Sequence, residues 1–322
     1  EECRAGNIAV LLGPGLNIYR HSQSGRNFEY FGEDPFFISR MIENFVKGVQ
    51  STGTIATIKH FIANNTDYFR RKSNSIVDER TLNEIYLKGF KAGIDAGALA
   101  VMTSYNLLHG NWTGQDKYTI KKLLRENLGF KWLVMTDWWS VDDCKKVVES
   151  GQDLEMPYRV ATLNAEEMLK TDKIKESDID QMVLNQLKTF KVSGAYENQI
   201  DVSMLDRYSN HEMAALETAR EGTILLKNNG VLPLESDKKI LITGPFAEKL
   251  AEGGGAGTVI GYNRTTPFDA LKEIYGDRLI KSLSPTEAEL KQASSIILCT
   301  GTLDSEGWDR PFELPERLNL RS

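Results

Sequence analysis

Short apolar runs alternate with amphipathic stretches through the first half of the chain, and this alternation restricts the possible folds more than any other feature. The apolar runs are IAVLLGPG (8–15), TIATIKHF (54–61), ALAVMTSYN (98–106), WLVMTDWW (132–139) and the fifth candidate QDLEMP (152–157). The intervening stretches, such as 35–51 and 78–97, have helical patterns. Strands that alternate with helices indicate a parallel sheet with helical crossovers. The pattern predicts an α/β fold of the (β/α)₈ barrel type, with a doubly wound sheet as the alternative.

The stretch 78–97 is the clearest of the predicted helices. It places Leu82, Ile85, Tyr86 and Phe90 on one face, and Gly97 follows as the residue that ends the helix. Five candidate strands are fewer than the eight that a closed barrel needs. We therefore expect residues 1–195 to form an incomplete (β/α)₈ TIM-like barrel domain that lacks its first strands.

A second α/β pattern follows a change in composition. Residues 196–216 are polar and irregular in pattern, which is typical of a linker. Beyond them, alternating strand and helix patterns include ALETAREGTILLKNN, KKILITGPFA, PFDALKEIYG and SSIILCTGTL. We expect residues 217–322 to form an α/β sandwich domain that is truncated at its C-terminal end.

Charge and composition exclude several function classes. The formal net charge is −6 and no basic run is present, which argues against a nucleic-acid-binding protein. No apolar stretch is long enough to cross a bilayer, so we expect no membrane segment. Cys3, Cys144 and Cys299 lie far apart and resemble neither a disulfide framework nor a metal site. No cofactor or metal is predicted.

Polar and aromatic residues follow the predicted strands of the first domain. In parallel α/β sheets, ligands bind beyond the carboxyl ends of the strands. The residues at those ends are Lys59, His60, Asn64, Asn65, Tyr105, Asn106, Asp137, Trp138 and Trp139. Such side chains hydrogen-bond hydroxyl groups, and aromatic faces pack against the apolar side of a sugar ring. The set predicts a carbohydrate site.

Asp137 is the first candidate for catalysis, because a buried strand should not end in an unpaired carboxylate. Glycoside hydrolysis needs two carboxyl groups, one of which protonates the leaving oxygen. Asp304, Glu306 and Asp309 follow an apolar strand of the second domain, and the pattern alone does not choose among them. The nearby stretch EGGGAGTVIG (252–261) matches neither a Walker loop nor a dinucleotide fingerprint. We interpret it as a mobile loop between domains.

A series of longer motifs resembles glycoside hydrolase family 3 of the β-glucosidase type. The motifs are GRNFEYFGEDP, IATIKHFIANN, DERTLNEIYLKGFKAGI, AVMTSYNLLHG, LLRENLGFKWLVMTDWW, ETAREGTILLKNNGVLPL and GTLDSEGWDRPFELP. They occur in family order across nearly the whole chain. The resemblance implies a barrel domain followed by an α/β sandwich, with the active site in the cleft between them.

The resemblance also implies roles for individual residues. Asp137 of TDW corresponds to the nucleophile and Glu306 of SEG to the acid/base. The implied substrate-binding residues are Arg26, Lys59, His60, Arg70, Tyr105 and Trp138. Lys59, Arg70 and Tyr105 are expected near Asp137, where they would stabilise its ionised form. Four further family matches are interpreted as structural: Glu33, Asp34, Glu79 and Arg80. Ala256 stands where similar enzymes often carry Ser.

The function implied by this resemblance is a retaining, exo-acting β-glucosidase on β-glucosides or short β-linked gluco-oligosaccharides. The alternatives are a β-xylosidase or N-acetyl-β-glucosaminidase of the same family, or a non-catalytic sugar-binding fragment. No metal or organic cofactor is implied. Expected partners are the sugar substrate, another chain or segment that completes the barrel, and a second copy of the chain in a homo-oligomer.

Overall fold

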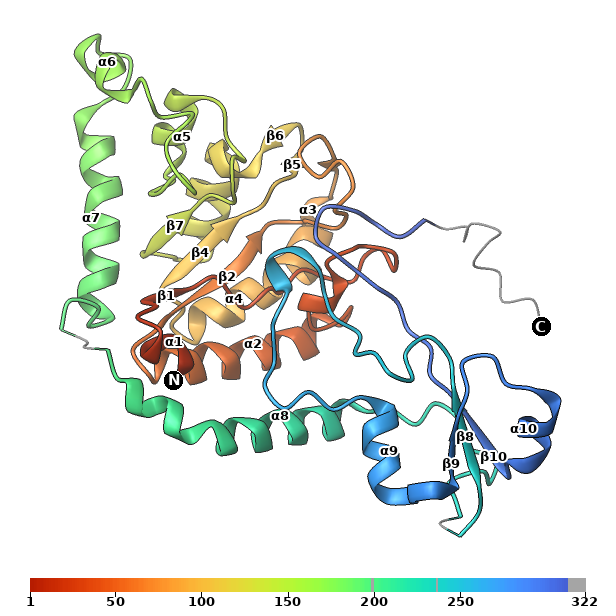
Figure 1. Cartoon of the computed structure of the whole chain (residues 1–322). Helices are drawn as coiled ribbons and strands as arrows, with labels where there is room; N and C mark the ends of the chain where they lie inside the picture. The colour runs from red at the N-terminus through yellow and green to blue at the C-terminus, as the bar shows by residue number, and fades with distance from the viewer. Residues whose placement is uncertain (198–199, 236, 312–322) are drawn as a thin grey trace. The chain divides into compact units, whose positions relative to one another are not determined.

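The structure, a computed structural model, describes residues 1–197, 200–235 and 237–311 (Figure 1). It divides into two compact units. The first contains residues 1–208 together with the segment that starts at Gly307, and the second contains Ser209–Glu306. Each unit is described by itself.

A parallel sheet with the strand order β1-β2-β4-β7 forms the centre of the first unit. Its strands are β1 (Val10–Leu11), β2 (Ile55–Phe61), β4 (Ala100–Thr103) and β7 (Leu133–Met135). Every pairing in this sheet is parallel, with Ala100 opposite both Thr57 and Leu133. The carboxyl ends of β2, β4 and β7 therefore meet at one edge (Figure 1). This is the α/β arrangement expected of an incomplete (β/α)₈ barrel.

Helices α2 (Pro35–Gln50) and α4 (Leu87–Asp95) pack against each other and against β2. Asp34 caps α2 by accepting the backbone N–H of Phe36 at 2.8 Å, and Pro35 occupies the first helical position. This is the structural role predicted for Asp34. The helices bury a cluster that includes Ile42 of α2, Phe90 of α4 and Ile58 of β2.

The predicted helix 78–97 is confirmed, but it is not a uniform α-helix. It comprises α3 (Glu79–Thr81), a π-helical segment (Leu82–Tyr86) and α4. Leu82, Tyr86 and Phe90 are buried as expected, whereas the prediction for Ile85 is wrong, because its side chain is exposed. A π-helical turn is wider than an α-helical turn, so the residue three positions after Leu82 rotates away from the core.

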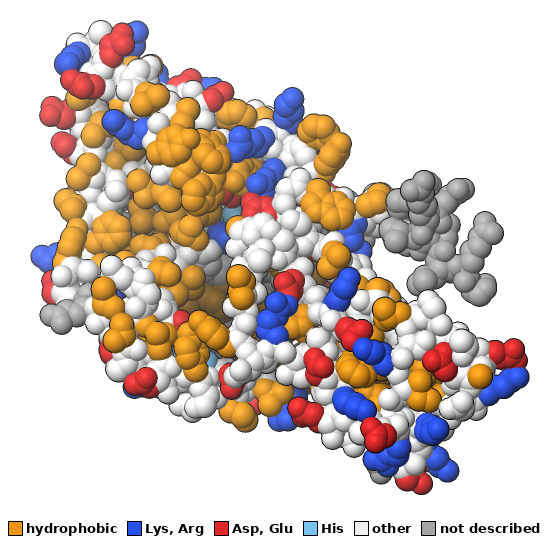
Figure 2. All heavy atoms as spheres, in the orientation of Figure 1, with side chains coloured by type: hydrophobic (Ala, Val, Ile, Leu, Met, Phe, Trp, Pro, Cys, Tyr) orange, Lys and Arg blue, Asp and Glu red, His pale blue; other side chains and the backbone are white. Residues whose placement is uncertain are grey.

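The opposite face of the sheet carries a second apolar cluster, because side chains alternate between the two faces of each strand. Its buried members are Ile55, Ala100, Met102, Leu133 and Met135. Phe190 of α7 (Glu176–Val192) packs against this face with the partly buried Val10, Leu12, Leu154 and Met156. Figure 2 shows hydrophobic side chains gathered over this part of the first unit, at the upper left of the view.

The prediction of a fifth strand at 152–157 is wrong. Leu154 forms only an isolated parallel bridge with Met135. The carboxylate of Asp153 accepts the backbone N–H of Val134 at 2.8 Å, which takes a donor that a continued ladder would use. The remaining elements of the first unit are α1 (Glu2–Ala5), η1 (Asn27–Glu29), β3 (Asn74–Ser75), β5 (Leu107–Leu108), β6 (Asn111–Trp112), η3 (Thr113–Gln115), η4 (Tyr118–Asn127), α5 (Cys144–Ser150), α6 (Ala165–Lys170) and η5 (Val202–Arg207).

The second unit contains a parallel sheet of order β10-β8-β9. Its elements are β8 (Ile240–Thr243), η6 (Gly255–Gly257), α9 (Pro267–Tyr275), η7 (Gly276–Arg278), β9 (Leu279–Lys281), α10 (Glu287–Gln292) and β10 (Ser295–Leu298). The central strand β8 is buried along its whole length. Capping boxes at Thr266 and Thr286 begin α9 and α10.

The segment between the two sheets is more helical than its composition suggested. Helix α8 spans Tyr208–Gly222 and follows η5 directly. Strong helix formers from Glu212 to Leu216 explain why this polar stretch is ordered as a helix. Residues 223–229 form no helix or strand, and their apolar members, Ile224 to Leu226, are exposed.

Candidate active site

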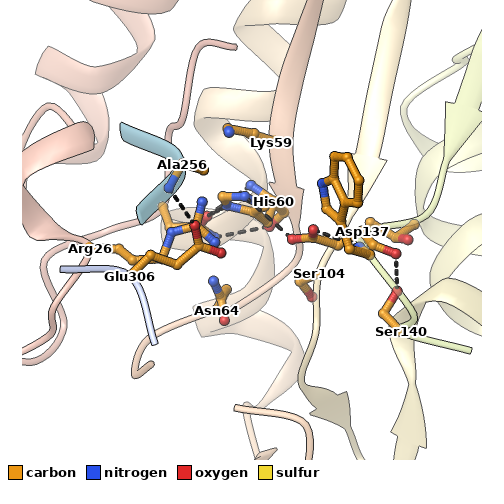
Figure 3. A network of polar contacts seen from close by, with 12 residues as sticks. Arg26, Lys59, His60, Asn64, Ser104, Asp137, Ser140, Ala256 and Glu306 are labelled. Atoms are coloured by element: carbon orange, nitrogen blue, oxygen red, sulfur yellow. Dashed lines mark hydrogen bonds and ion pairs between the residues drawn. The ribbon is translucent and has the colours of Figure 1, made fainter. Parts of the chain in front are cut away.

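Asp137 lies at the carboxyl end of β7, two residues beyond its last strand residue, and only 3% of it is exposed. One carboxylate oxygen accepts the backbone N–H of Trp138 at 2.8 Å. The other oxygen lies 3.5 Å from Nε2 of His60, which belongs to the carboxyl end of β2 (Figure 3). Ser140 closes the turn by donating its hydroxyl to the Asp137 carbonyl at 2.9 Å. The strand therefore delivers the carboxylate into a polar, enclosed position.

Burial has the largest effect on the charge state of Asp137 and raises its pKa. Arg26, the Trp138 N–H, Lys59 and a hydrogen bond from Tyr105 all act in the opposite direction. Two of the three partners expected from the sequence, Lys59 and Tyr105, thus stabilise the carboxylate. The leading cation is Arg26 rather than the expected Arg70. Desolvation nevertheless outweighs these partners, so the pKa of Asp137 lies above its usual value.

Glu29 joins the two cations that act on Asp137. It accepts a hydrogen bond from Nε of Arg26, and its other oxygen lies 3.8 Å from Nζ of Lys59. Arg26 is 2% exposed and Lys59 is 8% exposed, so both charges are held away from bulk water. A buried cation needs a partner, and one carboxylate serves both.

His60 is fixed by residues from two other parts of the chain. Asn17 accepts the His60 backbone N–H at 2.8 Å and donates to the His60 carbonyl at 2.9 Å. Nδ1 of the ring lies 3.2 Å from both the Tyr30 hydroxyl and Oδ1 of Asn17. Burial, followed by the charges of Arg26, Lys59 and Arg70, holds the pKa of His60 well below its usual value. The imidazole is therefore neutral and acts through hydrogen bonds.

Arg70 is held between a carboxylate and an aromatic ring. Its Nη1 donates to both oxygens of Asp67, at 3.2 and 3.1 Å. Its guanidinium carbon lies 3.9 Å from the ring centre of Tyr105, a cation–π arrangement. Because Tyr105 also hydrogen-bonds Asp137, these contacts form a continuous chain from Asp67 to the β7 carboxylate.

Trp138 and Trp139 form an exposed aromatic surface next to Asp137. Trp138 is 38% exposed and Trp139 is 42% exposed, and their ring centres lie 6.1 Å apart. The backbone of Trp139 has a positive φ of 53°, which is rare for a bulky residue. Its N–H donates to the Met156 carbonyl at 3.1 Å, and this bond holds the turn. Exposed aromatic faces of this kind suit sugar rings.

Glu306 belongs to the second unit, where a glycine-rich loop contacts it. The backbone N–H of Ala256 donates to Oε2 of Glu306 at 3.0 Å (Figure 3). Gly254 forms a bridge with Ser305 and accepts the backbone N–H of Glu306 at 3.2 Å. A Cβ on Gly255 would lie 2.6 Å from Cβ of Glu306, so only glycine fits there. The interpretation of this stretch as a loop between domains is wrong, because it lies within the second unit, where backbone hydrogen bonds join it to the Glu306 loop.

The three acidic candidates after β10 have different surroundings. Asp304 accepts the Thr302 hydroxyl at 3.2 Å. Asp309 belongs to the first unit, where its carboxylate accepts three backbone N–H groups, from Gly25, Asp67 and Tyr68. These three donors occupy both carboxylate oxygens of Asp309, a distinction that the sequence pattern did not make.

Two family models match the chain: the glycosyl hydrolase family 3 N terminal domain over residues 1–188, and the glycosyl hydrolase family 3 C-terminal domain over residues 223–320. The chain belongs to glycosyl hydrolase family 3. Among curated relatives, it is 36% identical over 284 residues to the thermostable beta-glucosidase B of Acetivibrio thermocellus. That match covers 87% of this chain and 37% of the relative.

Solved structures of beta-glucosidases have a similar fold. Beta-glucosidase 3B from Thermotoga neapolitana, in complex with glycerol, matches with a TM-score of 0.86 and 32% identity, over 96% of this chain and 49% of that one. Beta-glucosidase from Kluyveromyces marxianus, in complex with glucose, matches with a TM-score of 0.82 and 31% identity, over 88% and 36%. The chain thus spans about a third to a half of the length of these relatives.

Most of the predicted site residues lie close together near the strand ends of the first unit. Those residues are Arg26, Lys59, His60, Arg70, Tyr105, Asp137 and Trp138. Sequence reasoning missed Asn17, Glu29, Tyr30 and Asp67, which hold those side chains in place. Asn17 follows the first apolar run, so the rule about carboxyl ends of strands could have found it. Glu29 and Tyr30 lie inside the quoted motif GRNFEYFGEDP and Asp67 lies outside the quoted motifs, and none of the three had a signal of its own.

Two further findings concern the described part of the chain. Residues 1–197, 200–235 and 237–311 contain no group of three or more His, Cys, Asp or Glu side chains arranged to hold a metal ion. Across the same ranges, every helix is too short or too polar to cross a membrane.

Proposed function

We propose that the protein containing this chain is a retaining, exo-acting β-glucosidase that releases glucose from the non-reducing end of β-glucosides or β-linked gluco-oligosaccharides. The observation that carries the proposal is the buried Asp137 carboxylate at the end of β7, with Arg26, Lys59 and Tyr105 acting on it. Further support comes from the relatives named above, which are beta-glucosidases.

In the first step, an oxygen of Asp137 attacks the anomeric carbon and forms a covalent glycosyl ester. The bond from that carbon to the leaving oxygen breaks, and its electron pair stays on the oxygen. The Glu306 carboxyl group gives its proton to that oxygen, so the aglycone leaves as a neutral alcohol. The cations beside Asp137 favour its ionised form, which a nucleophile requires.

In the second step, the Glu306 carboxylate takes a proton from water, and the hydroxide equivalent attacks the anomeric carbon. The ester bond breaks and its electron pair returns to Asp137, which is ready for another cycle. Two inversions at one carbon give net retention. The Ala256 N–H donates to one oxygen of Glu306 and holds this carboxyl group on the glycine-rich loop.

We assign substrate binding to the polar groups around the nucleophile. Arg26, Lys59 and Arg70 are donors without acceptor capacity, so they suit sugar hydroxyl oxygens. Neutral His60 can donate or accept according to its tautomer. The exposed ring of Trp138 would border the bound sugar. No step of this mechanism requires a metal or an organic cofactor.

The roles of the two carboxyl groups can be separated by azide rescue of alanine variants on 2,4-dinitrophenyl β-glucoside. Asp137→Ala should lower kcat by about 10⁴-fold or more. Azide should restore turnover and give the α-glycosyl azide, because it attacks the β-substrate once. Glu306→Ala still forms the ester with this leaving group, so azide should give the β-glycosyl azide. Product anomers are read by NMR.

The control is Asp277→Ala, which removes a fully exposed carboxylate. Azide products of the opposite anomeric configuration would refute the assigned roles. The sugar preference is tested by comparing kcat/KM for the 4-nitrophenyl β-glucoside, β-xyloside and N-acetyl-β-glucosaminide. The β-glucoside should be the best substrate, and a higher value for either of the others would identify that alternative activity instead.

We further propose that the second face of the first-unit sheet packs against another chain or segment that completes the barrel. The support is that Val10, Leu12, Leu154, Met156 and Phe190 remain only partly buried against this face. Binding of an apolar dye, together with the mass in solution by light scattering, tests this idea. A monomer of this chain should bind the dye, and Phe190→Ser should reduce that binding. If the second copy is the partner, the measured mass should be a multiple of 36.2 kDa.

A further inference from the structure

Asp309 has an unusual set of partners for a side chain in a loop. Oδ1 accepts the backbone N–H groups of Gly25 at 3.0 Å and of Asp67 at 2.9 Å, and Oδ2 accepts that of Tyr68 at 3.1 Å. Gly25 and Asp67 lie 284 and 242 residues away from it in the chain. One carboxylate thus satisfies three backbone donors from two separate loops. Hydrogen bonds to an ionised acceptor are roughly twice as strong as neutral ones.

The residues on both sides of Asp309 are attached to the same two loops. The backbone N–H of Gly307 donates to the carboxylate of Asp67. On the other side, the Arg310 N–H donates to the Gln23 carbonyl at 2.8 Å, and Nη2 of Arg310 donates to the Ser22 carbonyl at 2.8 Å. The segment 307–310 is therefore fixed on loops 22–25 and 67–68 of the first unit.

These two loops adjoin residues of the proposed site. Loop 22–25 leads directly into Arg26, whose guanidinium acts on Asp137. Asp67 binds Arg70, and Arg70 packs over the Tyr105 ring. The segment that starts one residue after Glu306 is thus bonded to the loops that carry the sugar-binding cations.

We propose that Asp309 is the positioning residue for Glu306. Under the proposed function, which this inference requires, Glu306 must be held in place during proton transfer. By fixing residues 307–309, Asp309 sets the point from which the chain leads back into Glu306. Its own oxygens are occupied by backbone N–H groups, so it acts through position and not as a second proton donor.

The test uses a series of aryl β-glucosides whose leaving groups range from 2,4-dinitrophenol to phenol. A poor leaving group must be protonated by the catalytic acid as it departs, whereas an activated one need not be. Loss of the acid therefore lowers kcat/KM most for the poorest leaving group and least for the most activated one. Asp309→Ala should lower kcat/KM by about 10²-fold on phenyl β-glucoside, the scale of a 1 Å misplacement, and far less on the dinitrophenyl substrate. Glu306→Ala should show the same dependence on the leaving group, with a larger loss in kcat/KM on the phenyl substrate.

Two further variants keep the test interpretable. Asp309→Asn keeps one oxygen for the Gly25 and Asp67 donors and loses the acceptor for Tyr68, so its effect should be intermediate. Asp277→Ala, which removes a fully exposed carboxylate, should behave as wild type. Hydrogen exchange followed by mass spectrometry should show faster exchange of peptides containing Gly25, Tyr68 and Gly307 in Asp309→Ala.

The outcomes separate the two proposals. If Asp309→Ala loses activity equally on all leaving groups while Glu306→Ala shows the gradation, the positioning role is refuted and the acid/base role stands. If Glu306→Ala shows no gradation, the proposed role of Glu306 fails and the inference fails with it. Unchanged exchange at Gly25, Tyr68 and Gly307 in Asp309→Ala would also overturn the inference.

Discussion

Under the proposed function, Gly255→Ala should impair proton transfer by Glu306, although Glu306 itself is not substituted. The new Cβ would lie 2.6 Å from Cβ and 3.2 Å from Oε2 of Glu306. Carbon atoms in contact prefer about 3.5–4.0 Å, so one of the two groups must move by about 1 Å. The Ala256 N–H bond to Oε2, now 3.0 Å, would then exceed the length of a hydrogen bond.

The size of the effect follows from these distances. A displacement of about 1 Å can cost about 10²-fold in rate, which corresponds to about 2.7 kcal/mol in the activation free energy. Separately, Gly255 has a φ of +75°, and an L-residue in that region costs about 1–2 kcal/mol in stability. We therefore expect a folded variant with a lower melting temperature and impaired proton transfer.

The assay compares kcat/KM for methyl β-glucoside, which needs the acid, with that for 2,4-dinitrophenyl β-glucoside, which does not. Gly255→Ala should lose about 10²-fold on the first substrate and much less on the second. Gly261→Ala is the matched control from the same stretch, because its Cβ would meet only Cγ of Arg264 at 3.7 Å. Wild-type kcat/KM on methyl β-glucoside in a folded Gly255→Ala variant would refute the reasoning.

Three other variants test the electrostatics and the core of the first unit. Burial raises the pKa of Asp137 above its unfolded value of 3.8. The contribution of Asp137 to the free energy of unfolding is therefore most favourable below pH 3.8, where the group is protonated, and is lost as the pH rises through the folded-state pKa. Asp137→Asn should therefore raise the melting temperature at about pH 7, and this increase should become smaller towards about pH 4.5. An increase in melting temperature that grows on acidification would contradict the predicted direction. Glu29→Gln removes the negative charge shared by the two cations beside Asp137, so these cations should lower the pKa of Asp137 further. The acidic limb of the pH profile of kcat/KM should therefore move to lower pH, and a shift to higher pH would contradict this prediction. Phe90→Ala removes a buried ring whose centre lies 4.8 Å from that of Phe61, and should cost about 3–5 kcal/mol in urea unfolding, whereas the exposed Ile274→Ala should cost little.

Local patterns in the sequence determined the main elements of the fold. Apolar runs located β2, β4 and β7, and the period of the stretch 35–51 located α2, because burial and helix periodicity are properties of neighbouring residues. The rule that ligands bind at the carboxyl ends of parallel strands also selected Lys59, His60, Tyr105 and Asp137. The resemblance to family 3 added Arg26 and Arg70, and distinguished Glu306 from its acidic neighbours.

Tertiary structure alone decided which groups hold those residues in place. Asn17 contacts His60 across 43 positions of the chain, and Asp309 contacts Gly25 across 284. Such pairs depend on the path of the backbone through space, and no local period or propensity records that path. The charge state of Asp137 was decided in the same way, because its pKa depends on burial, which sums over every element around the carboxylate.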